Sequence, residues 1–228
     1  KMKSEVASFM ASNLKIGSRI LDVGCGFGTL LNIFKTKYQA QVQGIELATL
    51  DIEAAKTFYG LDLFKGNLKE FWEHFPDQKF DCIVLHHTFE HMSEPREELK
   101  IMRQMIASQG ILYIGVPNVM NLKKRPEIFF QKGHPYSYSP ATLEKILSLE
   151  GFKIIKFNHG AAFPGAMEAL AMRSEDLGTE RPAEKLSEGA DYRKVISHIQ
   201  RTKNKFALLR TLRETALFWL PQKFRLKI

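Results

Sequence analysis

The sequence predicts an α/β protein with a doubly wound, mostly parallel sheet and a basic helical extension at its C-terminus. Short apolar runs that suit buried strands alternate with longer stretches of helical periodicity. The first run, residues 20–23, leads into three glycines at alternate positions and then into a helical pattern. Residues 181–228 carry 12 Lys and Arg against 4 Asp and Glu, whereas residues 1–180 are neutral overall. We therefore expect a sheet domain over residues 1–175 and a separate basic extension over residues 176–228.

Strands and helices can be assigned in order along the chain. The apolar runs predict strands over residues 20–23, 42–46, 61–65, 80–85, 110–116 and 153–157. Helical periodicity predicts helices over residues 4–13, 29–38, 49–59, 97–107 and 139–150. Phe71, Trp72 and Phe75 recur at helical spacing and are expected in the core rather than as a lid over a ligand. Residues 166–173 suit a helix as well as a strand.

The composition excludes several classes of protein. At 228 residues with 44% hydrophobic content, the chain is long and apolar enough for a packed α/β domain and is not disordered. It contains no apolar run of the length that spans a membrane and opens with no signal-peptide pattern, so a cytoplasmic protein is expected. Cys25 and Cys82 are too few for a disulfide framework or a zinc cluster, and both are expected to be reduced.

The turn between the first strand and the first covering helix is expected to bind a ligand. Glycines at positions 24, 26 and 28 allow positive φ angles and close approach, and a helix N-terminus offers free N–H groups. The spacing is Gly-x-Gly-x-Gly, with Thr29 after the last glycine, and therefore departs from the Gly-x-Gly-x-x-Gly dinucleotide fingerprint. Glu46 closes the next strand 22 residues after Gly24, about where a ribose-binding carboxylate is expected.

Asp22, the alternating glycines and Glu46 together resemble the S-adenosylmethionine site of the class I methyltransferases. The resemblance implies a Rossmann-like methyltransferase fold with a seven-stranded sheet, whose additional antiparallel strand would be residues 166–173. It also implies more helix before the first strand than this chain shows. Because the chain opens Lys1-Met2, the alternatives are a truncation at this point and a missing upstream segment. Asn67 stands where the family commonly has an acid that binds the adenine amino group, and its amide oxygen can still accept that bond. The cofactor residues expected on this basis are Asp22, Gly24, Cys25, Gly26, Gly28, Glu46, Leu47, Asn67, Leu68 and His86.

Three further motifs narrow the resemblance to the ubiquinone-biosynthesis-type O-methyltransferases and related enzymes that methylate sugars and other small molecules. These are the turn Glu90-His91-Met92-Ser93-Glu94-Pro95 and the segments over residues 110–118 and 134–140. Methyl transfer to a hydroxyl requires alignment of the oxygen with the methyl carbon and removal of the hydroxyl proton. Histidine, with a reference pKa of about 6.5, suits that base. His91 and His134 are the candidates, each for catalysis, acceptor binding or a structural role, and Glu90 either orients one of them or is structural.

The histidine segment also matches metal-binding signatures, but no metal is expected. Residues 87–91 read His-x-x-Glu-His, as in some zinc peptidases, yet they follow a strand rather than lie on a helix, and no third ligand motif is evident. Some ubiquinone-branch enzymes bind a divalent metal through Glu-x-x-Glu-His, and this chain has His87 at the first of those positions.

Other functions remain open at this stage. A nucleic-acid methyltransferase could hold phosphates with the basic tail, although the chain lacks an aromatic-interleaved basic platform and an Asn-Pro-Pro-Tyr-like base-flipping motif. A binding module could retain the cofactor site without catalysis. A nicotinamide oxidoreductase is disfavoured by Thr29 at the position of the third glycine.

The C-terminal extension is expected to contain one or two helices over residues 191–220. Its apolar residues are spaced three and four apart, with basic residues between them. One interpretation is that the apolar stripe packs on the domain or on a second copy in a homodimer. The other is that residues 191–228 lie on the anionic inner face of a membrane and bring the active site to a lipid-linked acceptor.

Overall fold

The computed structural model describes residues 2–122, 130, 133–159, 165–174 and 188–219. Within the final helix it describes side chains only for residues 193–208.

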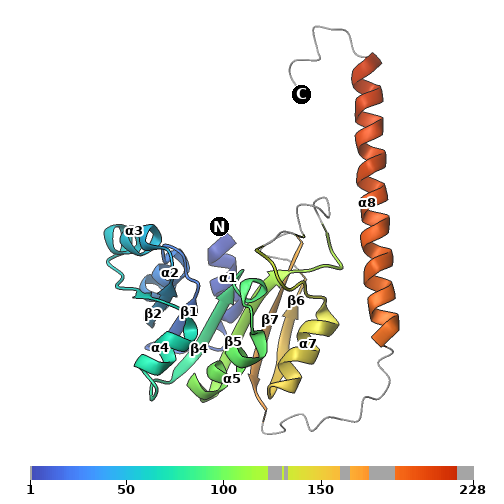
Figure 1. The fold of residues 1–228 in the computed structure, drawn as a ribbon. Helices are drawn as coiled ribbons and strands as arrows, with labels where there is room; N and C mark the ends of the chain where they lie inside the picture. The colour runs from blue at the N-terminus through green and yellow to red at the C-terminus, as the bar shows by residue number, and fades with distance from the viewer. Residues whose placement is uncertain (1, 123–129, 131–132, 160–164, 175–187, 220–228) are drawn as a thin grey trace.

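One sheet of seven strands forms the centre of the protein (Figure 1). Strands β1, β2, β3, β4 and β5 are parallel, and β7 lies antiparallel between β5 and β6. This confirms the doubly wound, mostly parallel fold expected from the sequence. In spatial order the strands are β3 (Phe64–Lys65), β2 (Gln41–Glu46), β1 (Arg19–Val23), β4 (Phe80–His86), β5 (Ile106–Pro117), β7 (Ala166–Arg173) and β6 (Phe152–Asn158).

The strand β7 resolves the one segment whose secondary structure the sequence left open. Residues 166–171 are all buried, and β7 pairs with β5 on one side and β6 on the other. The hydrogen-bonding partners on both sides outweigh a helix propensity that differs by only a few tenths of a kcal/mol per residue.

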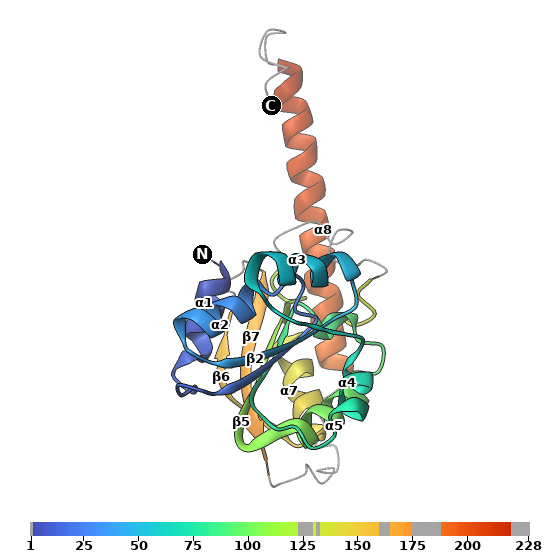
Figure 2. The ribbon, with the colours of Figure 1, turned by 90° about the vertical axis from the view of Figure 1, so that its left-hand side faces the viewer.

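Helices cover both faces of the sheet (Figures 1 and 2). The helices α1 and α2 pack on one face, with α3 against α2, and α4, α5 and α7 pack on the other. Two of them begin with a capping box, formed by Asn67 with Glu70 and by Ser139 with Thr142. Their bounds are α1 (Met2–Ala11), α2 (Thr29–Lys37), α3 (Thr49–Tyr59), α4 (Leu68–His74), α5 (Pro95–Met105) and α7 (Pro140–Leu149).

The boundaries of the elements shift where tertiary pairing decides them. Residues 61–63, expected at the start of a strand, precede a β3 of only two residues, and β5 begins four residues earlier than expected, at Ile106.

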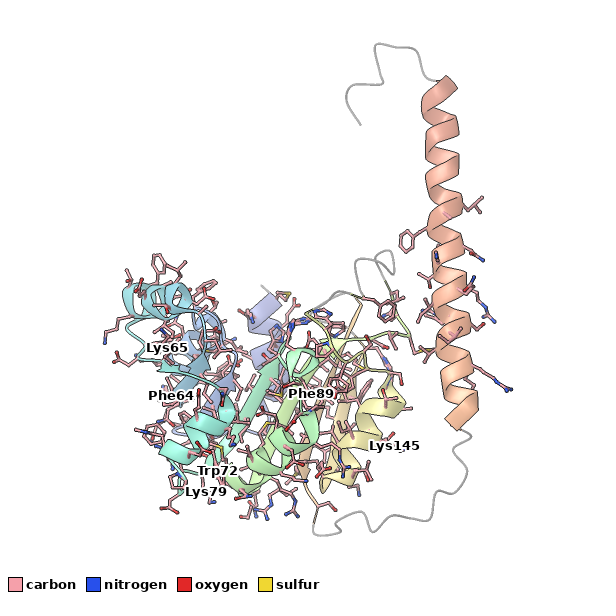
Figure 3. The ribbon with its side chains drawn as sticks, viewed as in Figure 1. Phe64, Lys65, Trp72, Lys79, Phe89 and Lys145 are labelled. Carbon is pink, nitrogen blue, oxygen red and sulfur yellow. The ribbon has the colours of Figure 1, made fainter. Side chains whose placement is uncertain are left out.

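The aromatic cluster lies in the core as predicted. Phe71 is buried against Phe64 and Phe80, and Trp72 is partly buried beside it (Figure 3).

The extension forms a single helix, α8 (Glu188–Trp219), whose far end stands clear of the sheet domain (Figures 1 and 2). Val195, Ile199 and Phe206 are half-buried along one side of it, whereas Arg201 and Lys205 are exposed. Ile196, which the spacing also places in the apolar stripe, is 44% exposed, and the stripe residues from Leu209 onward lie outside the described side chains. Among the described residues, no helix has both the length and the apolarity needed to cross a membrane.

Candidate active site

The glycine turn after β1 holds a backbone conformation that side chains rarely adopt. Gly24, Gly26 and Gly28 have φ angles of 70°, 57° and 77°, and α2 begins directly after them. A Cβ atom at Gly24 would lie 2.7 Å from both Cγ2 and Oγ1 of Thr88, whereas a Cβ at Gly26 would meet nothing within 4 Å. The backbone of Gly26 is therefore open to a ligand, and that of Gly24 packs against the segment that follows β4.

Glu46, at the end of β2, is held against the glycine turn. Its Oε2 atom accepts a hydrogen bond of 2.8 Å from the backbone N–H of Gly26. Its Oε1 atom accepts from the N–H groups of Leu47 and Ala48 at 2.8 and 2.9 Å. The carboxylate and the turn, predicted from their spacing to share one ligand, thus lie in contact.

Asp22 is buried below the turn and lacks a complete set of partners. Its side chain is 2% exposed, and its Oδ1 atom meets no hydrogen-bond donor among the described residues. Burial raises the pKa of this carboxyl to about 7, the positive charge of Lys3 opposes that rise, and the carboxylate of Glu46 adds to it. A buried acceptor without a donor at the edge of a ligand site suits a ligand that brings a donor or a positive charge.

The other expected cofactor residues differ in what they can offer. Asn67 is exposed, and its Oδ1 atom already accepts from the N–H of Glu70 at 2.9 Å. Leu47 is 68% exposed and free to cover a ligand, whereas the side chain of Leu68 belongs to the core. Cys25 packs with Leu31 and Ala55 behind the turn, where burial raises the pKa of its thiol.

His86 ends β4 and takes part in a buried row of hydrogen-bonded side chains that was not predicted from the sequence. Its Nδ1 atom lies 3.3 Å from the hydroxyl of Tyr113, which donates to Oε1 of Glu168 at 2.9 Å. Asn158 donates to the other oxygen of Glu168 at 3.0 Å. The available signal was a tyrosine and a glutamate inside two otherwise apolar strands, and this signal gives no indication that the two side chains meet.

His91, His134 and Glu90 come together above the end of β4. The rings of His91 and His134 are 4.7 Å apart, and Nδ1 of His91 lies 2.5 Å from the carbonyl oxygen of Gly133. Because a carbonyl only accepts, Nδ1 of His91 carries a proton and its Nε2 atom is the basic one in the neutral ring. Glu90 is buried, and its Oε1 atom lies 3.3 Å from Nδ1 of His87. Neighbouring Phe89, labelled in Figure 3, is buried and anchors this turn. Its ring stacks on that of Tyr138.

The same three residues form a group that could hold a metal ion. One ligand atom from each of Glu90, His91 and His134 lies within 4.8 Å of the others. No metal is expected from the sequence because no third ligand motif is evident near residues 87–91. In the structure, a third possible ligand atom comes from His134, which lies 43 residues after His91 in the chain.

The glycine turn and the histidine segment after β4 lie against each other. Thr88 contacts the glycine turn at Gly24, and the rings of His86 and His87 lie 4.8 Å apart. Apart from the side chains of Cys25 and Leu68, which pack in the core, the expected site residues lie around the carboxyl ends of β1, β2, β3 and β4, where open α/β sheets bind ligands.

Residues 1–156 match a family described as a methyltransferase domain. The chain belongs to this methyltransferase family. This confirms the resemblance drawn from the glycine turn, and with it S-adenosylmethionine as the cofactor. The open backbone of Gly26, the carboxylate of Glu46 and the unpartnered Oδ1 of Asp22 fit such a group.

Relatives of known activity include O-methyltransferases. The O-methyltransferase cnsE of Penicillium expansum is 30% identical over 151 residues, which cover 61% of this chain and 53% of that protein. The ubiquinone biosynthesis O-methyltransferase of Pasteurella multocida is 26% identical over 115 residues, covering 45% and 47%. The matched region thus spans about half the length of these two relatives.

Solved structures of the same fold include a SAM-dependent methyltransferase from Archaeoglobus fulgidus, with a TM-score of 0.64 and 18% identity over 74% of this chain and 91% of that one. The plantazolicin methyltransferase BamL, solved in complex with a triazolic desmethylPZN analogue and SAH, has a TM-score of 0.60 and 13% identity, covering 76% of this chain and 84% of that one. These likenesses show that the domain shares its fold with these structures.

Proposed function

We propose that this protein transfers a methyl group from S-adenosylmethionine to a hydroxyl of a small-molecule, saccharide or lipid-linked acceptor, with a histidine as the general base. One observation carries the proposal. The contact between Thr88 and Gly24 sets the histidine segment after β4 directly against the cofactor turn. The O-methyltransferases among its relatives support hydroxyl transfer over other methylations.

The glycine turn, Asp22 and Glu46 hold the cofactor in this proposal, with Leu47, Asn67 and His86 at its edges. When bound, S-adenosylmethionine supplies an electrophilic methyl on a sulfonium sulfur. The carboxylate of Glu46 accepts hydrogen bonds from the ribose hydroxyls.

His91, His134 and Glu90 are the proposed acceptor-facing residues. The two rings meet edge to face, so they form one polar wall whose position depends on the Gly133 carbonyl. Glu90 holds the turn from below through His87. We assign the histidine pair to contact with the acceptor, and its loss should stop turnover without loss of cofactor binding.

The experiment compares ligands and products. Calorimetry should show binding of S-adenosylhomocysteine and much weaker binding of NAD, and catechol or a methyl glycoside incubated with S-adenosylmethionine should yield a methyl ether by mass spectrometry. Tighter binding of NAD would overturn the assignment to methyl transfer. Binding of S-adenosylhomocysteine with no ether formed from any hydroxyl acceptor would favour the module that has lost catalysis.

The α8 helix supports a second, more specific part of the proposal, in which the protein is cytoplasmic and lies at the inner face of a membrane. Its described side chains, those of residues 193–208, include no acid, and the basic ones are exposed: Arg193, Lys194, Arg201, Lys203 and Lys205. Each basic residue near an anionic surface contributes about 1 kcal/mol to binding. Binding of α8 to the membrane would bring the active site to a lipid-linked acceptor. There are two alternatives. In one, α8 packs on the domain or in a homodimer, and in the other it binds phosphates for a nucleic-acid methyltransferase.

A further inference from the structure

A buried row of polar side chains crosses the sheet from β4 to β6 and ends at the proposed site. It consists of His86, Tyr113, Glu168 and Asn158, which lie on four neighbouring strands. His86 is 8% exposed, Tyr113 is fully buried and Glu168 is 2% exposed. Burial of polar groups costs free energy of desolvation, so the presence of this row inside the protein needs an explanation.

Gly115 makes room for this row. It pairs with His86 on one side and Glu168 on the other, and a Cβ atom there would lie 2.7 Å from the hydroxyl of Tyr113 and 3.2 Å from Nδ1 of His86. The hydrogen bond between His86 and Tyr113 therefore depends on a glycine at this position of β5.

The direction of each hydrogen bond in the row follows from the protons that each side chain carries. Both oxygens of Glu168 accept, one from Tyr113 and one from Asn158, as a carboxylate does. Tyr113 has a single hydroxyl proton, and because that proton goes to Glu168, the hydroxyl oxygen must accept from Nδ1–H of His86. His86 is therefore a neutral Nδ1–H imidazole whose Nε2 atom carries the lone pair.

The Nε2 atom of His86 is buried and meets no hydrogen-bond partner among the described residues. Burial, the positive charge of Lys3 and the neighbouring His87 lower the pKa of His86 to about 3, so an imidazolium is unstable at this position. Burial and Glu168 raise the pKa of Tyr113, which stays a phenol. A base at this position must therefore pass its proton on.

We propose that His86, Tyr113 and Glu168 form a relay that removes the proton of the acceptor hydroxyl during methyl transfer. The proposal rests on the function proposed above and names its base. As the new O–CH₃ bond forms and the S–CH₃ bond breaks, with the electron pair kept by sulfur, the hydroxyl proton goes to Nε2 of His86. The Nδ1 proton passes to Tyr113, and the hydroxyl proton of Tyr113 passes to Glu168.

The charges balance in this sequence of transfers. At the start the sulfonium is positive and Glu168 is negative. At the end the sulfur is a neutral thioether, Glu168 is a neutral acid, Tyr113 is again a phenol and His86 is a neutral Nε2–H imidazole. No ion pair has to persist in the buried region, which is what a low-dielectric interior favours. Product release then leaves Glu168 to return its proton along the same row.

The first test needs neither cofactor nor acceptor. In a long-range ¹H–¹⁵N spectrum of protein with ¹⁵N-labelled histidine, His86 should be the Nδ1–H tautomer with an unprotonated Nε2, its signals being assigned by their absence in His86→Gln. Tyr113→Phe should lose this preference for one tautomer, and Glu168→Gln should keep it, since Gln still offers an oxygen to Tyr113. An Nε2–H tautomer in the unchanged protein would overturn the relay.

The second test uses turnover with catechol as the acceptor. His86→Gln should lower kcat by ~10²–10⁴-fold, as the loss of a general base does. Tyr113→Phe and Glu168→Gln should lower it at least tenfold with an unchanged Kd for S-adenosylhomocysteine, whereas Tyr38→Phe, a tyrosine outside the row that contacts Ser8, should have no effect. An unchanged kcat in both Tyr113→Phe and Glu168→Gln would refute the relay. Absence of methylated catechol in the unchanged protein would count against the proposed function instead, and the tautomer spectrum would still decide the relay.

Discussion

The backbone N–H of Gly26 donates a 2.8 Å hydrogen bond to Oε2 of Glu46, which joins the glycine turn to the end of the neighbouring strand. Two residues that are 20 positions apart thereby hold one ligand surface in shape before any ligand binds. The carboxylate is already satisfied by three backbone donors. Its remaining lone pairs are therefore held in fixed directions, as the proposed contact with the ribose hydroxyls requires.

We expect Glu46→Ala to weaken binding of S-adenosylhomocysteine at least tenfold. Hydrogen bonds to a charged group are worth about 1.5–3 kcal/mol each, and two would be lost. Calorimetry measures the change. Glu46→Gln separates the causes, since it retains an acceptor oxygen near the turn and loses the charge. An unaltered Kd in the alanine variant would show that the ribose lies elsewhere.

Gly24→Ala should destabilise the protein more than Gly26→Ala. Both positions have positive φ, which costs about 1–2 kcal/mol for a residue with a side chain, but only Gly24 faces Thr88. The added methyl at Gly24 therefore also meets a packing clash of about 1–3 kcal/mol. Urea unfolding measures both variants. Equal midpoints would mean that Thr88 moves away without cost.

Asp22→Asn should remove part of the pH dependence of stability. Burial raises the pKa of Asp22 from 3.8 to about 7, so between these values the folded protein binds a proton that the unfolded chain releases. This contribution to the free energy of unfolding is therefore complete below pH 4 and is lost as the pH rises to 7. The asparagine variant stays neutral throughout. From pH 4 to 7, the free energy of unfolding of the variant should therefore rise relative to that of the unchanged protein. A difference that stays constant over this range would show that Asp22 is ionised from pH 4 to 7.

His91→Ala and His134→Ala should affect turnover and leave the Kd of S-adenosylhomocysteine unchanged. At least one of them should lower kcat/KM by about 10²-fold or more, because these rings form the proposed wall for the acceptor. His74→Ala, on α4, is the matched control. Near-normal product formation by both variants would remove the pair from the site.

Reversal of the charges on α8 should abolish salt-sensitive binding to anionic vesicles. The full chain should sediment with phosphatidylserine vesicles at low salt and less at high salt, because exposed charges are screened. The triple variant Arg201→Glu, Lys203→Glu and Lys205→Glu should remain in the supernatant. A triple reversal of the exposed Lys15, Lys35 and Lys37 on the domain changes the net charge equally and should keep the binding. Equal binding by both triple variants would leave α8 as a packing or dimerisation element.

The sequence by itself determined the parts of this protein that depend on local conformation. The glycine turn, the strand before it and Glu46 could be predicted because positive φ angles, a helix start and a carboxylate at a fixed spacing leave a pattern within about 25 residues. The alternation of strands and helices determined the doubly wound sheet for the same reason, since each element carries its own periodicity.

Only the tertiary structure decided which distant side chains meet. Residues 166–173 have no strong preference for helix or strand, and their insertion between β5 and β6 both makes them a strand and brings Glu168 to Tyr113. His134 reaches His91 across 43 positions, and the side chain of Leu68 packs in the core. These relationships arise from sheet order and packing, which depend on contacts between segments far apart in the chain, so no local pattern of residues records them.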